Sequence, residues 1–372
     1  MEEIKDKSLV KTASYVGGQW QLEGNSFSVD DPSTGQCIAQ VVDADENMAK
    51  QAVSAAKQAL PAWSALSANK RAKFLHSWFE LILAHKEDLA RILTLEQGKP
   101  IAEAIGEIAY GAGFIEWFAE EGKRIYGDTI PSPSSDKRIV VIKQPVGVVA
   151  AITPWNFPNA MITRKAAAAL AAGCTFIVRP SELTPFSALA LAELAERAGI
   201  PAGVFNVVVS QHADKIGKVL TEHADIAKFT FTGSTRVGKI LAAQCASTLK
   251  KVSLELGGNA PFIVFDDADI NAAVQGAIES KYRNAGQTCI CTNRIFVQQQ
   301  VLAEFTEKYH AEVAKLTLGN GLDVNCNIGP MISKNAVKKV TQLVKDSVSE
   351  GAKILIGGQT DPLGECFINP PY

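Results

Sequence analysis

The spacing of apolar residues changes along the chain, and each change marks a new kind of element. Residues 15–42 carry short apolar runs interrupted by turn residues such as Gly17-Gly18 and Asp31-Pro32, a pattern typical of strands and turns. From residue 45 to about 121, apolar residues recur at intervals of three and four, as in the run from Phe74 to Ile82. This periodicity predicts helices whose apolar faces enter a core.

Residues 126–146 interrupt the helical pattern. The run Pro131-Ser-Pro-Ser-Ser135 indicates a loop, and the apolar run Arg138-Ile-Val-Val-Ile-Lys143 follows it with a charge at each end. We expect this run to form an exposed strand, which is a candidate for pairing outside its own sheet.

Strands and helices alternate regularly after Val146. The expected strands cover 148–152, 175–178, 204–209 and 227–230, and the expected helices cover 158–172, 185–198, 213–222 and 234–246. This alternation predicts a parallel sheet covered on both faces, and right-handed crossovers would make it doubly wound, with ligands at the carboxyl ends of its strands. The series restarts after Gly257-Gly258, so the paired glycines mark the expected boundary between two lobes.

Composition excludes several classes of function. The chain has 372 residues, enough for two domains, and its 47% hydrophobic and 20% charged content is that of a globular protein. A net charge of -2 gives no electrostatic reason to expect nucleic acid or a membrane surface as a partner. No apolar run approaches a membrane span and no secretory signal is visible at the start, so we expect a cytoplasmic protein.

The seven cysteines are scattered and odd in number, which favours a reducing compartment over a disulfide framework. Cys289 and Cys291 are the one close pair. They lack a second cysteine pair or a histidine at zinc spacing, so no metal site is expected.

Cys289 is the first candidate for chemistry. It ends the run Gly286-Gln-Thr-Cys289, in which the glycine permits a tight turn and the close approach of a ligand. A thiol presented this way becomes a nucleophile if a neighbouring group removes its proton. The alternative is a buried structural cysteine, which is common for an isolated cysteine.

Two further candidates lie at expected strand ends. Asn156, in Thr153-Pro-Trp-Asn-Phe-Pro158, could donate its amide to a developing oxyanion, or it could simply form a turn before a helix. Glu255, in Leu254-Glu-Leu-Gly-Gly258, has apolar neighbours. If buried, it would be suited to accept a proton from water, although a paired or solvated glutamate is the commoner case.

Two strand-to-helix turns could hold a dinucleotide. Gly233 and Gly238 flank a turn that offers free amides at a helix start, although their spacing differs from the usual dinucleotide fingerprint and an ordinary capped turn also fits. Glu182 follows another strand, where a carboxylate could bind an adenosine ribose and would repel a 2′-phosphate. A helix-capping segment is the alternative there.

Four motifs together resemble those of the aldehyde dehydrogenase superfamily over essentially the whole chain. They are Pro154-Trp-Asn-Phe-Pro158, Phe231-Thr-Gly-Ser-Thr235, Leu254-Glu-Leu-Gly-Gly258 and Gly286-Gln-Thr-Cys289. A closer resemblance, to succinate-semialdehyde dehydrogenases, rests on Met161-Ile-Thr-Arg-Lys165, Pro185-Phe-Ser-Ala-Leu-Ala190, Asn259-Ala-Pro-Phe-Ile-Val-Phe265 and Arg283-Asn-Ala-Gly-Gln-Thr-Cys-Ile-Cys291. The resemblance implies a Rossmann-type doubly wound parallel sheet and a second α/β catalytic lobe.

The resemblance also implies a role for each matched residue. Cys289 would attack the aldehyde, Asn156 would hold the oxyanion, and Glu255 would activate the water that hydrolyses a thioester. Arg164 and Arg283 would bind the distal carboxylate of the semialdehyde. Cys291 could form a reversible disulfide with the nucleophile, or it could be a small buried residue. The matched cofactor-contacting positions are Trp155, Arg179, Glu182, Gly233, Ser234 and Leu256.

The family pattern also implies domain limits and an assembly. Residues 1–125 and 146–256 would form the dinucleotide-binding domain, 126–145 an oligomerisation strand segment, and 257–372 the catalytic domain. The sequence stops at Pro370-Pro-Tyr372, before a motif that usually contacts the cofactor ribose, so we expect a C-terminally truncated catalytic lobe. A homo-oligomer is expected of the full-length family.

The expected reaction is the NAD(P)-dependent oxidation of succinate semialdehyde to succinate, a step of 4-aminobutyrate degradation. Glu182 favours NAD over NADP, while Arg179 stands where many relatives have lysine. Glutarate semialdehyde, one methylene longer, is an alternative substrate. An inactive truncated cofactor-binding protein is a second alternative. A CoA-acylating enzyme is disfavoured because Glu255 favours water as the acyl acceptor.

Overall fold

A seven-stranded sheet organises the chain up to Glu255. In the computed structural model, which describes residues 3–372, the strand order is β11-β10-β7-β8-β9-β1-β2. The five strands from β11 to β9 pair in parallel, and β1 and β2 add an antiparallel edge. The strands are β1 (Ser14–Val16), β2 (Gln19–Gln21), β7 (Val148–Ile152), β8 (Thr175–Arg179), β9 (Phe205–Val207), β10 (Ile226–Thr232) and β11 (Lys251–Glu255). The predicted parallel α/β sheet is confirmed, with an antiparallel edge in addition.

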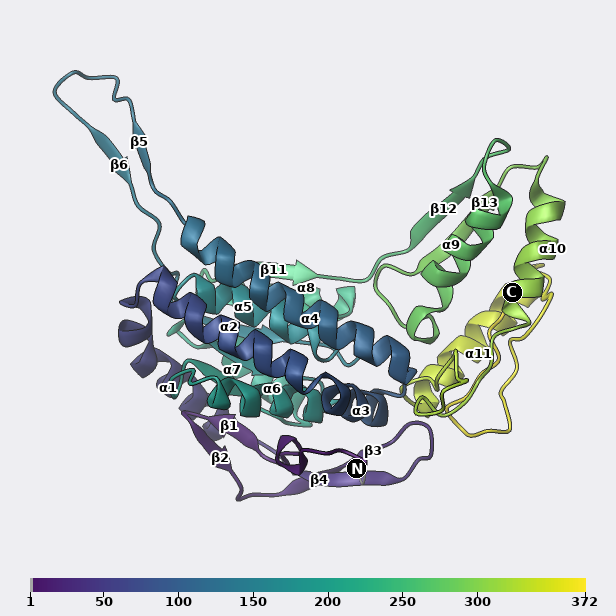
Figure 1. Ribbon diagram of the computed structural model, residues 1–372, viewed down its shortest axis with the longest axis horizontal. Coiled ribbons are helices and arrows are strands. Elements are labelled where there is room, and N and C mark those ends of the chain that lie inside the picture. The colour runs from purple at the N-terminus through teal and green to yellow at the C-terminus, as the bar shows by residue number, and fades with distance from the viewer. Residues whose placement is uncertain (1–2) are drawn as a thin grey trace.

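Helices cover both faces of this sheet (Figure 1). Successive residues of β7 point into different cores: Val149 and Ala151 pack mainly with α2 to α6, while Val148, Ala150 and Ile152 pack mainly with α1, α7 and α8. A strand buried on both faces needs an unbroken apolar run, which is why the sequence alone locates it. The helices are α1 (Glu46–Ser64), α2 (Ala68–Ala84), α3 (Lys86–Gln97), α4 (Ile101–Glu121), α5 (Ala160–Ala171), α6 (Pro185–Arg197), α7 (Ala213–Glu222) and α8 (Thr235–Ala246).

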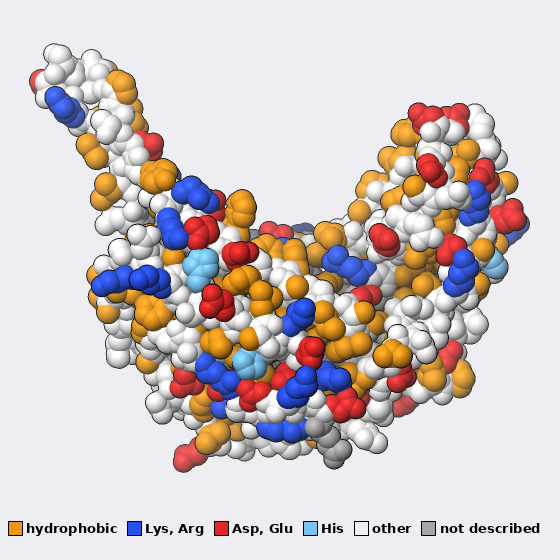
Figure 2. Space-filling model, viewed as in Figure 1, with side chains coloured by type: hydrophobic (Ala, Val, Ile, Leu, Met, Phe, Trp, Pro, Cys, Tyr) orange, Lys and Arg blue, Asp and Glu red, His pale blue; other side chains and the backbone are white. Residues whose placement is uncertain are grey.

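A hairpin of two exposed strands, β5 (Asp128–Ile130) and β6 (Ile139–Val141), projects from this body (Figure 1). The expected exposed strand is therefore present, and it pairs with a partner from its own segment. Figure 2 shows hydrophobic side chains along this arm, and Ile130, Ile139 and Val140 are exposed. A second small hairpin joins β3 (Ser26–Asp30) to β4 (Cys37–Val42), and short 3-10 turns occupy η1 (Lys7–Leu9) and η2 (Gly122–Arg124).

The chain after Gly257-Gly258 builds a second body with its own core. Strands β12 (Ala260–Val264) and β13 (Thr292–Val297) pair in parallel and pack with helices α9 (Ile270–Tyr282) and α10 (Leu302–Val313). The helix α11 (Lys334–Ser349) is an additional element beyond those expected from the sequence. The domain limits at 126, 146 and 257 remain our proposal. None of the helices within residues 3–372 is long and apolar enough to cross a membrane.

Candidate active site

The thiol loop lies between α9 and β13. It begins with a 3-10 turn, η3 (Arg283–Gly286), in which Asn284 and Ala285 have φ of 54° and Gly286 has φ of 76°. Left-handed backbone is unfavourable for residues other than glycine, by about 1 kcal/mol each, and it persists where surrounding contacts hold it. Cys289 follows as an exposed free thiol. The alternative of a buried structural cysteine is therefore wrong.

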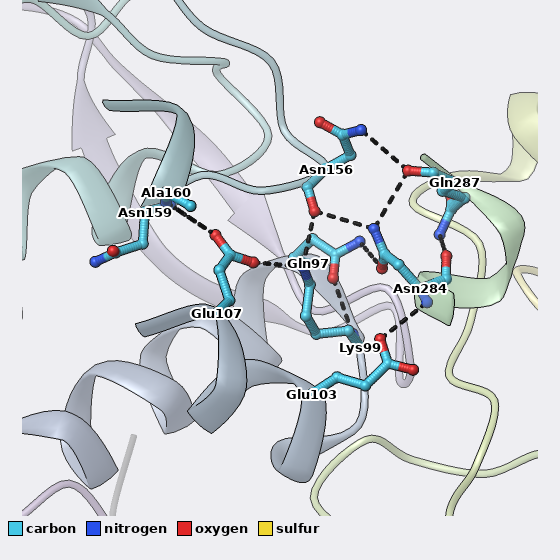
Figure 3. A network of polar contacts seen from close by, with 9 residues as sticks. All are labelled: Gln97, Lys99, Glu103, Glu107, Asn156, Asn159, Ala160, Asn284 and Gln287. Carbon is cyan, nitrogen blue, oxygen red and sulfur yellow. Dashed lines mark hydrogen bonds and ion pairs between the residues drawn. The ribbon is translucent and has the colours of Figure 1, made fainter. Parts of the chain in front are cut away.

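Asn284 ties this loop to the first body. Its backbone N–H donates to Glu103 Oε2 at 2.8 Å, and its side-chain Nδ2 donates to the carbonyl oxygen of Asn156 at 3.0 Å. Its Oδ1 accepts from Gln97 Nε2 at 2.8 Å (Figure 3). Asn284 is almost completely buried, so water does not compete for these bonds, and they hold the strained turn in place.

Asn156 lies four residues beyond the end of β7 and faces the thiol loop (Figure 3). Its side-chain Nδ2 donates to the carbonyl oxygen of Gln287 at 3.0 Å. Gln287 precedes Cys289 by two residues, so the amide and the thiol loop are neighbours. A side-chain amide has two N–H groups. One holds the loop, and the second is chemically able to receive an oxyanion.

Glu255 ends β11 at the same side of the molecule. Its carbonyl oxygen accepts from the Gly233 N–H at 3.0 Å, and its residue is exposed. Of the two possibilities left open for Glu255, the structure shows the solvated glutamate, because β11 is the outermost strand of the sheet. A Cβ placed on Gly258 would lie 3.2 Å from the carbonyl oxygen of Cys289. The segment that follows Glu255 therefore runs directly beside the thiol loop.

Neither Gly233 nor Gly238, at the junction of β10 and α8, has room for a Cβ atom. A Cβ on Gly233 would overlap the ring of Phe231, and a Cβ on Gly238 would lie 2.6 Å from Leu256 Cδ2. Ser234 Oγ accepts from the Val237 N–H at 3.3 Å and caps the helix. The glycines thus let the strand end and the helix pack closely, and the first amides of α8 suit a phosphate, as a bound dinucleotide requires.

Arg179 ends β8, next to β7 in the sheet, and its side chain is almost wholly buried. Its Nη2 donates to Glu182 Oε2 at 2.7 Å and to the Ser210 carbonyl at 2.6 Å, while its Nε has no protein partner. The carboxylate proposed to meet the ribose is therefore already paired with a cation. Because β10, β7 and β8 are neighbours, half-buried Trp155 and the Gly233 turn lie at this same edge of the sheet.

The two arginines approach one apolar cluster, formed by Phe157, Ala160 and Met161. The Arg283 guanidinium lies 5.0 Å from the centre of the Phe157 ring, and Arg164 Nη1 lies 3.9 Å from Met161 Sδ. Arg164 also donates to the Tyr110 hydroxyl at 2.6 Å. Within the described chain, neither guanidinium has a carboxylate within 4.0 Å.

A cavity of about 640 Å³ brings Arg164 and Glu255 together with Lys165. Lys165 Nζ donates to Thr230 Oγ1 at 3.0 Å, and burial lowers the pKa of this lysine to about 8, opposed by the nearby Glu255 carboxylate. Cys291 lies apart from this cavity. It is buried, its Sγ donates to the Lys281 carbonyl at 3.1 Å, and burial raises its pKa. Cys289 and Cys291 are both free thiols.

Sequence reasoning missed a buried polar network behind the site (Figure 3). Lys99 Nζ pairs with Glu107 Oε2 at 2.5 Å and donates to the Asn156 carbonyl at 2.8 Å. Both side chains are at most 1% exposed. The local signal, a lysine after the glycine that ends a helix, indicates only a helix terminus. No local spacing connects residue 99 with residue 156.

Comparisons with known proteins show the family of the chain. A model of the aldehyde dehydrogenase family matches residues 20–371. A glutarate-semialdehyde dehydrogenase of Pseudomonas aeruginosa is 56% identical over 99% of the chain and 76% of that protein. The succinate-semialdehyde dehydrogenase (NADP(+)) GabD of Escherichia coli is 54% identical over 99% and 76%. The crystal structure of succinate-semialdehyde dehydrogenase from Burkholderia pseudomallei superposes with a TM-score of 0.97, at 53% identity over 99% and 77% of the two chains.

Proposed function

The chain belongs to the aldehyde dehydrogenase family of NAD(P)-dependent oxidoreductases, and we propose that its substrate is succinate semialdehyde. The observation that carries this proposal is the pair Arg164 and Arg283. Both guanidiniums flank the Phe157 cluster, and neither has a carboxylate partner among residues 3–372. A guanidinium binds a carboxylate through parallel hydrogen bonds, so a semialdehyde could place its carboxylate between them while its aldehyde reaches the thiol loop.

The chemistry begins at Cys289. Its thiolate sulfur forms a bond to the aldehyde carbon, and the carbonyl oxygen becomes the oxyanion of a thiohemiacetal. The Asn156 amide and the backbone N–H of Cys289 hold that oxyanion. The nicotinamide ring, when bound, supplies the hydride acceptor. With a dinucleotide held at the cofactor edge, loss of hydride from the thiohemiacetal would leave a thioester on Cys289. Glu255 takes a proton from water, and the resulting hydroxide attacks the thioester carbon. The C–S bond then breaks, which returns the Cys289 thiolate and releases a carboxylic acid that ionises to the carboxylate.

The residues at the cofactor edge fit a dinucleotide without selecting strongly between its two forms. Glu182 disfavours a 2′-phosphate, but Arg179 neutralises part of its charge, and the Escherichia coli relative is named for NADP. We therefore propose that NAD remains usable and that NADP is tolerated. Glu182→Gln should raise the NADP to NAD ratio of kcat/KM by about three- to tenfold, as expected for one half-exposed charge.

Steady-state kinetics with matched aldehydes tests the substrate. We expect Arg164→Ala and Arg283→Ala each to raise KM for succinate semialdehyde by about 10- to 100-fold, the range for one charged hydrogen-bonded contact, and to leave an uncharged aliphatic aldehyde almost unaffected. Arg124→Ala, which changes an exposed arginine paired with Glu121, is the control. Equal losses with both aldehydes would refute the carboxylate assignment.

The same assay separates the alternatives. A higher kcat/KM with glutarate semialdehyde would favour the substrate that is one methylene longer, and the name of the Pseudomonas aeruginosa relative makes it the nearest competitor. One methylene changes the binding free energy by about 1–3 kcal/mol, so the kcat/KM values for the two semialdehydes should differ clearly. Dinucleotide binding without any aldehyde turnover would instead support a cofactor-binding role alone.

We also propose that the β5–β6 hairpin pairs with a second copy of the chain. Both strands are exposed along their full length, and an exposed apolar edge is a template for further pairing. Val140 is 68% exposed at the middle of β6, so Val140→Lys would place a charge on the proposed pairing surface. We expect this variant to form smaller species than the unchanged chain, as measured by analytical sedimentation. A cytoplasmic location stays a proposal that rests on the scattered, odd number of cysteines.

A further inference from the structure

The turn Gln97-Gly98-Lys99, between α3 and α4, touches both halves of the site. We propose that this turn positions the oxyanion donor against the nucleophile, with Lys99 as a positioning residue that acts through Asn156. The inference rests on the roles proposed above for Asn156 and Cys289 and deepens them. It requires that the turn fix the Asn156 backbone on one side and the thiol loop on the other.

Lys99 fixes the backbone of Asn156. Its ammonium is fully buried, lies 2.8 Å from the Asn156 carbonyl oxygen and 2.5 Å from Glu107 Oε2, and stands 3.9 Å above the Phe157 ring. A charged donor makes a stronger hydrogen bond than a neutral one, more so away from water. The carbonyl of Asn156 therefore has little freedom to rotate.

Glu107 fixes the segment that follows Asn156. Its second oxygen, Oε1, accepts from the backbone N–H of Asn159 at 3.0 Å and of Ala160 at 3.2 Å. These groups open α5, where free amides favour a negative charge. The ion pair thus holds the Asn156 carbonyl through Lys99 and the start of the next helix through Glu107 (Figure 3).

Gln97 fixes the thiol loop from the other end of the turn. Its Nε2 donates to Asn284 Oδ1 at 2.8 Å, and its Oε1 accepts from the Lys99 N–H at 3.0 Å. Asn284 Nδ2 completes the circuit at 3.0 Å from the same Asn156 carbonyl that Lys99 contacts. That carbonyl has two lone pairs, and both have a donor.

The consequence is geometric control over catalysis. The backbone of Asn156 is bonded to Lys99 and the turn that precedes Cys289 is bonded to Gln97, two residues of one short turn, so the amide and the thiol keep a fixed spacing. Loss of one oxyanion donor typically lowers kcat by about 100- to 1,000-fold, and a displacement of about 1 Å can cost about 100-fold. Lys99 contacts the carbonyl of Asn156 and not the reacting atoms, so its loss should lower kcat and leave KM nearly unchanged.

A double-mutant cycle on kcat tests this role. We expect Lys99→Met to lower kcat by about 10- to 100-fold, below the full loss of a donor. If Lys99 acts through Asn156, then Lys99→Met in an Asn156→Ala background should lower kcat by less than about threefold further. A double variant whose fold-decrease in kcat equals the product of the two single decreases would overturn the proposal. Glu96→Gln, one residue before the turn and directed to another helix, should leave kcat unchanged.

A second variant keeps the test readable if Lys99→Met does not fold. Gln97→Ala removes the bond to Asn284 without changing the charge of the buried network, and it should also lower kcat at constant KM. In an Asn156→Ala background, the same substitution should lower kcat no further. The cycle uses whichever aldehyde the unchanged chain oxidises fastest, so a preference for an uncharged aldehyde would refute the proposed substrate alone. Hydrogen exchange needs no turnover. It should accelerate in Gln97→Ala at residues 153–160 and 284–289, and unchanged exchange in both segments would overturn the proposal.

Discussion

Two buried glutamates cap two helices of the same body, and only one of them is connected to the site. Glu96 accepts from the backbone N–H groups of Phe186 at 2.7 Å and Ser187 at 2.8 Å, at the start of α6. Glu107 accepts in the same way at the start of α5. Glu107 has the Lys99 ammonium beside it, whereas no cation pairs with Glu96 among the residues that the structure describes.

The difference shows what the ion pair adds. Glu96, whose pKa burial raises to about 8, caps α6 in its protonated form without a cation, so capping α5 does not by itself require Lys99. A buried lysine is costly, and burial lowers the pKa of Lys99 even with Glu107 opposing it. The contact that Glu96 lacks is the one onward to the Asn156 carbonyl. The extra charges are therefore explained by the site rather than by the helix.

Removing the Lys99 ammonium should have the largest effect on stability. Lys99→Met leaves the Glu107 carboxylate buried without its cation, which typically costs about 3–5 kcal/mol. Lys99→Met with Glu107→Gln should recover a substantial part of that loss, because no charge is then left unpaired. Urea unfolding followed by fluorescence of the buried Trp63 and Trp78 measures it. Equal losses with and without Glu107→Gln would show that the charge pairing is unimportant.

A methyl group on Gly98 should disturb the turn that carries Lys99. Gly98 has φ of 94°, and a Cβ there would lie 2.6 Å from Pro330 Cγ. We expect Gly98→Ala to lower the free energy of unfolding by about 2–3 kcal/mol, from left-handed strain plus overpacking, and to reduce kcat. Gly35→Ala separates the two causes. Gly35 has φ of 70° with no atom within 4 Å, so it should lose only about 1 kcal/mol.

Glu96→Gln should change the pH dependence of stability. Burial raises the pKa of Glu96 from 4.5 to about 8, partly opposed by the hydroxyl and N–H groups of Ser187 and by the N–H of Phe186. The folded state thus binds a proton that the unfolded state releases, so this contribution to stability is present below pH 4.5 and is lost as the pH rises through about 8. At pH 5 the variant should cost about 1 kcal/mol, for one lost backbone bond. Its urea midpoint should fall less between pH 5 and 8.5 than that of the unchanged chain.

The strands of the sheet and the motif residues could be predicted from the sequence, whereas the buried polar network behind the site could not. Strand β7 could be located because an unbroken apolar run has few other uses, and Cys289 and Asn156 could be proposed from their motifs and strand-end positions. The burial of Lys99 and Glu107 could not be predicted, because charged residues are normally exposed and their third partner lies at residue 156. The exposure of Glu255 could not be decided from the sequence, since a strand's place at the sheet edge follows from strand order and not from its own residues.

Two neighbours in the thiol loop give the smallest and most selective test of this comparison. Asn284 and Ala285 share a φ of 54°, but Asn284 makes side-chain bonds to Gln97 and Asn156, while the methyl group of Ala285 gives no hydrogen bond in return for its strain. Ala285→Gly should therefore stabilise the chain by up to about 1 kcal/mol, and Asn284→Gly should destabilise it although it relieves the same strain. Urea midpoints of the two variants measure this. Stabilisation by both would mean that the polar network does not hold the loop, and that the link between Glu107 and the site is structural coincidence.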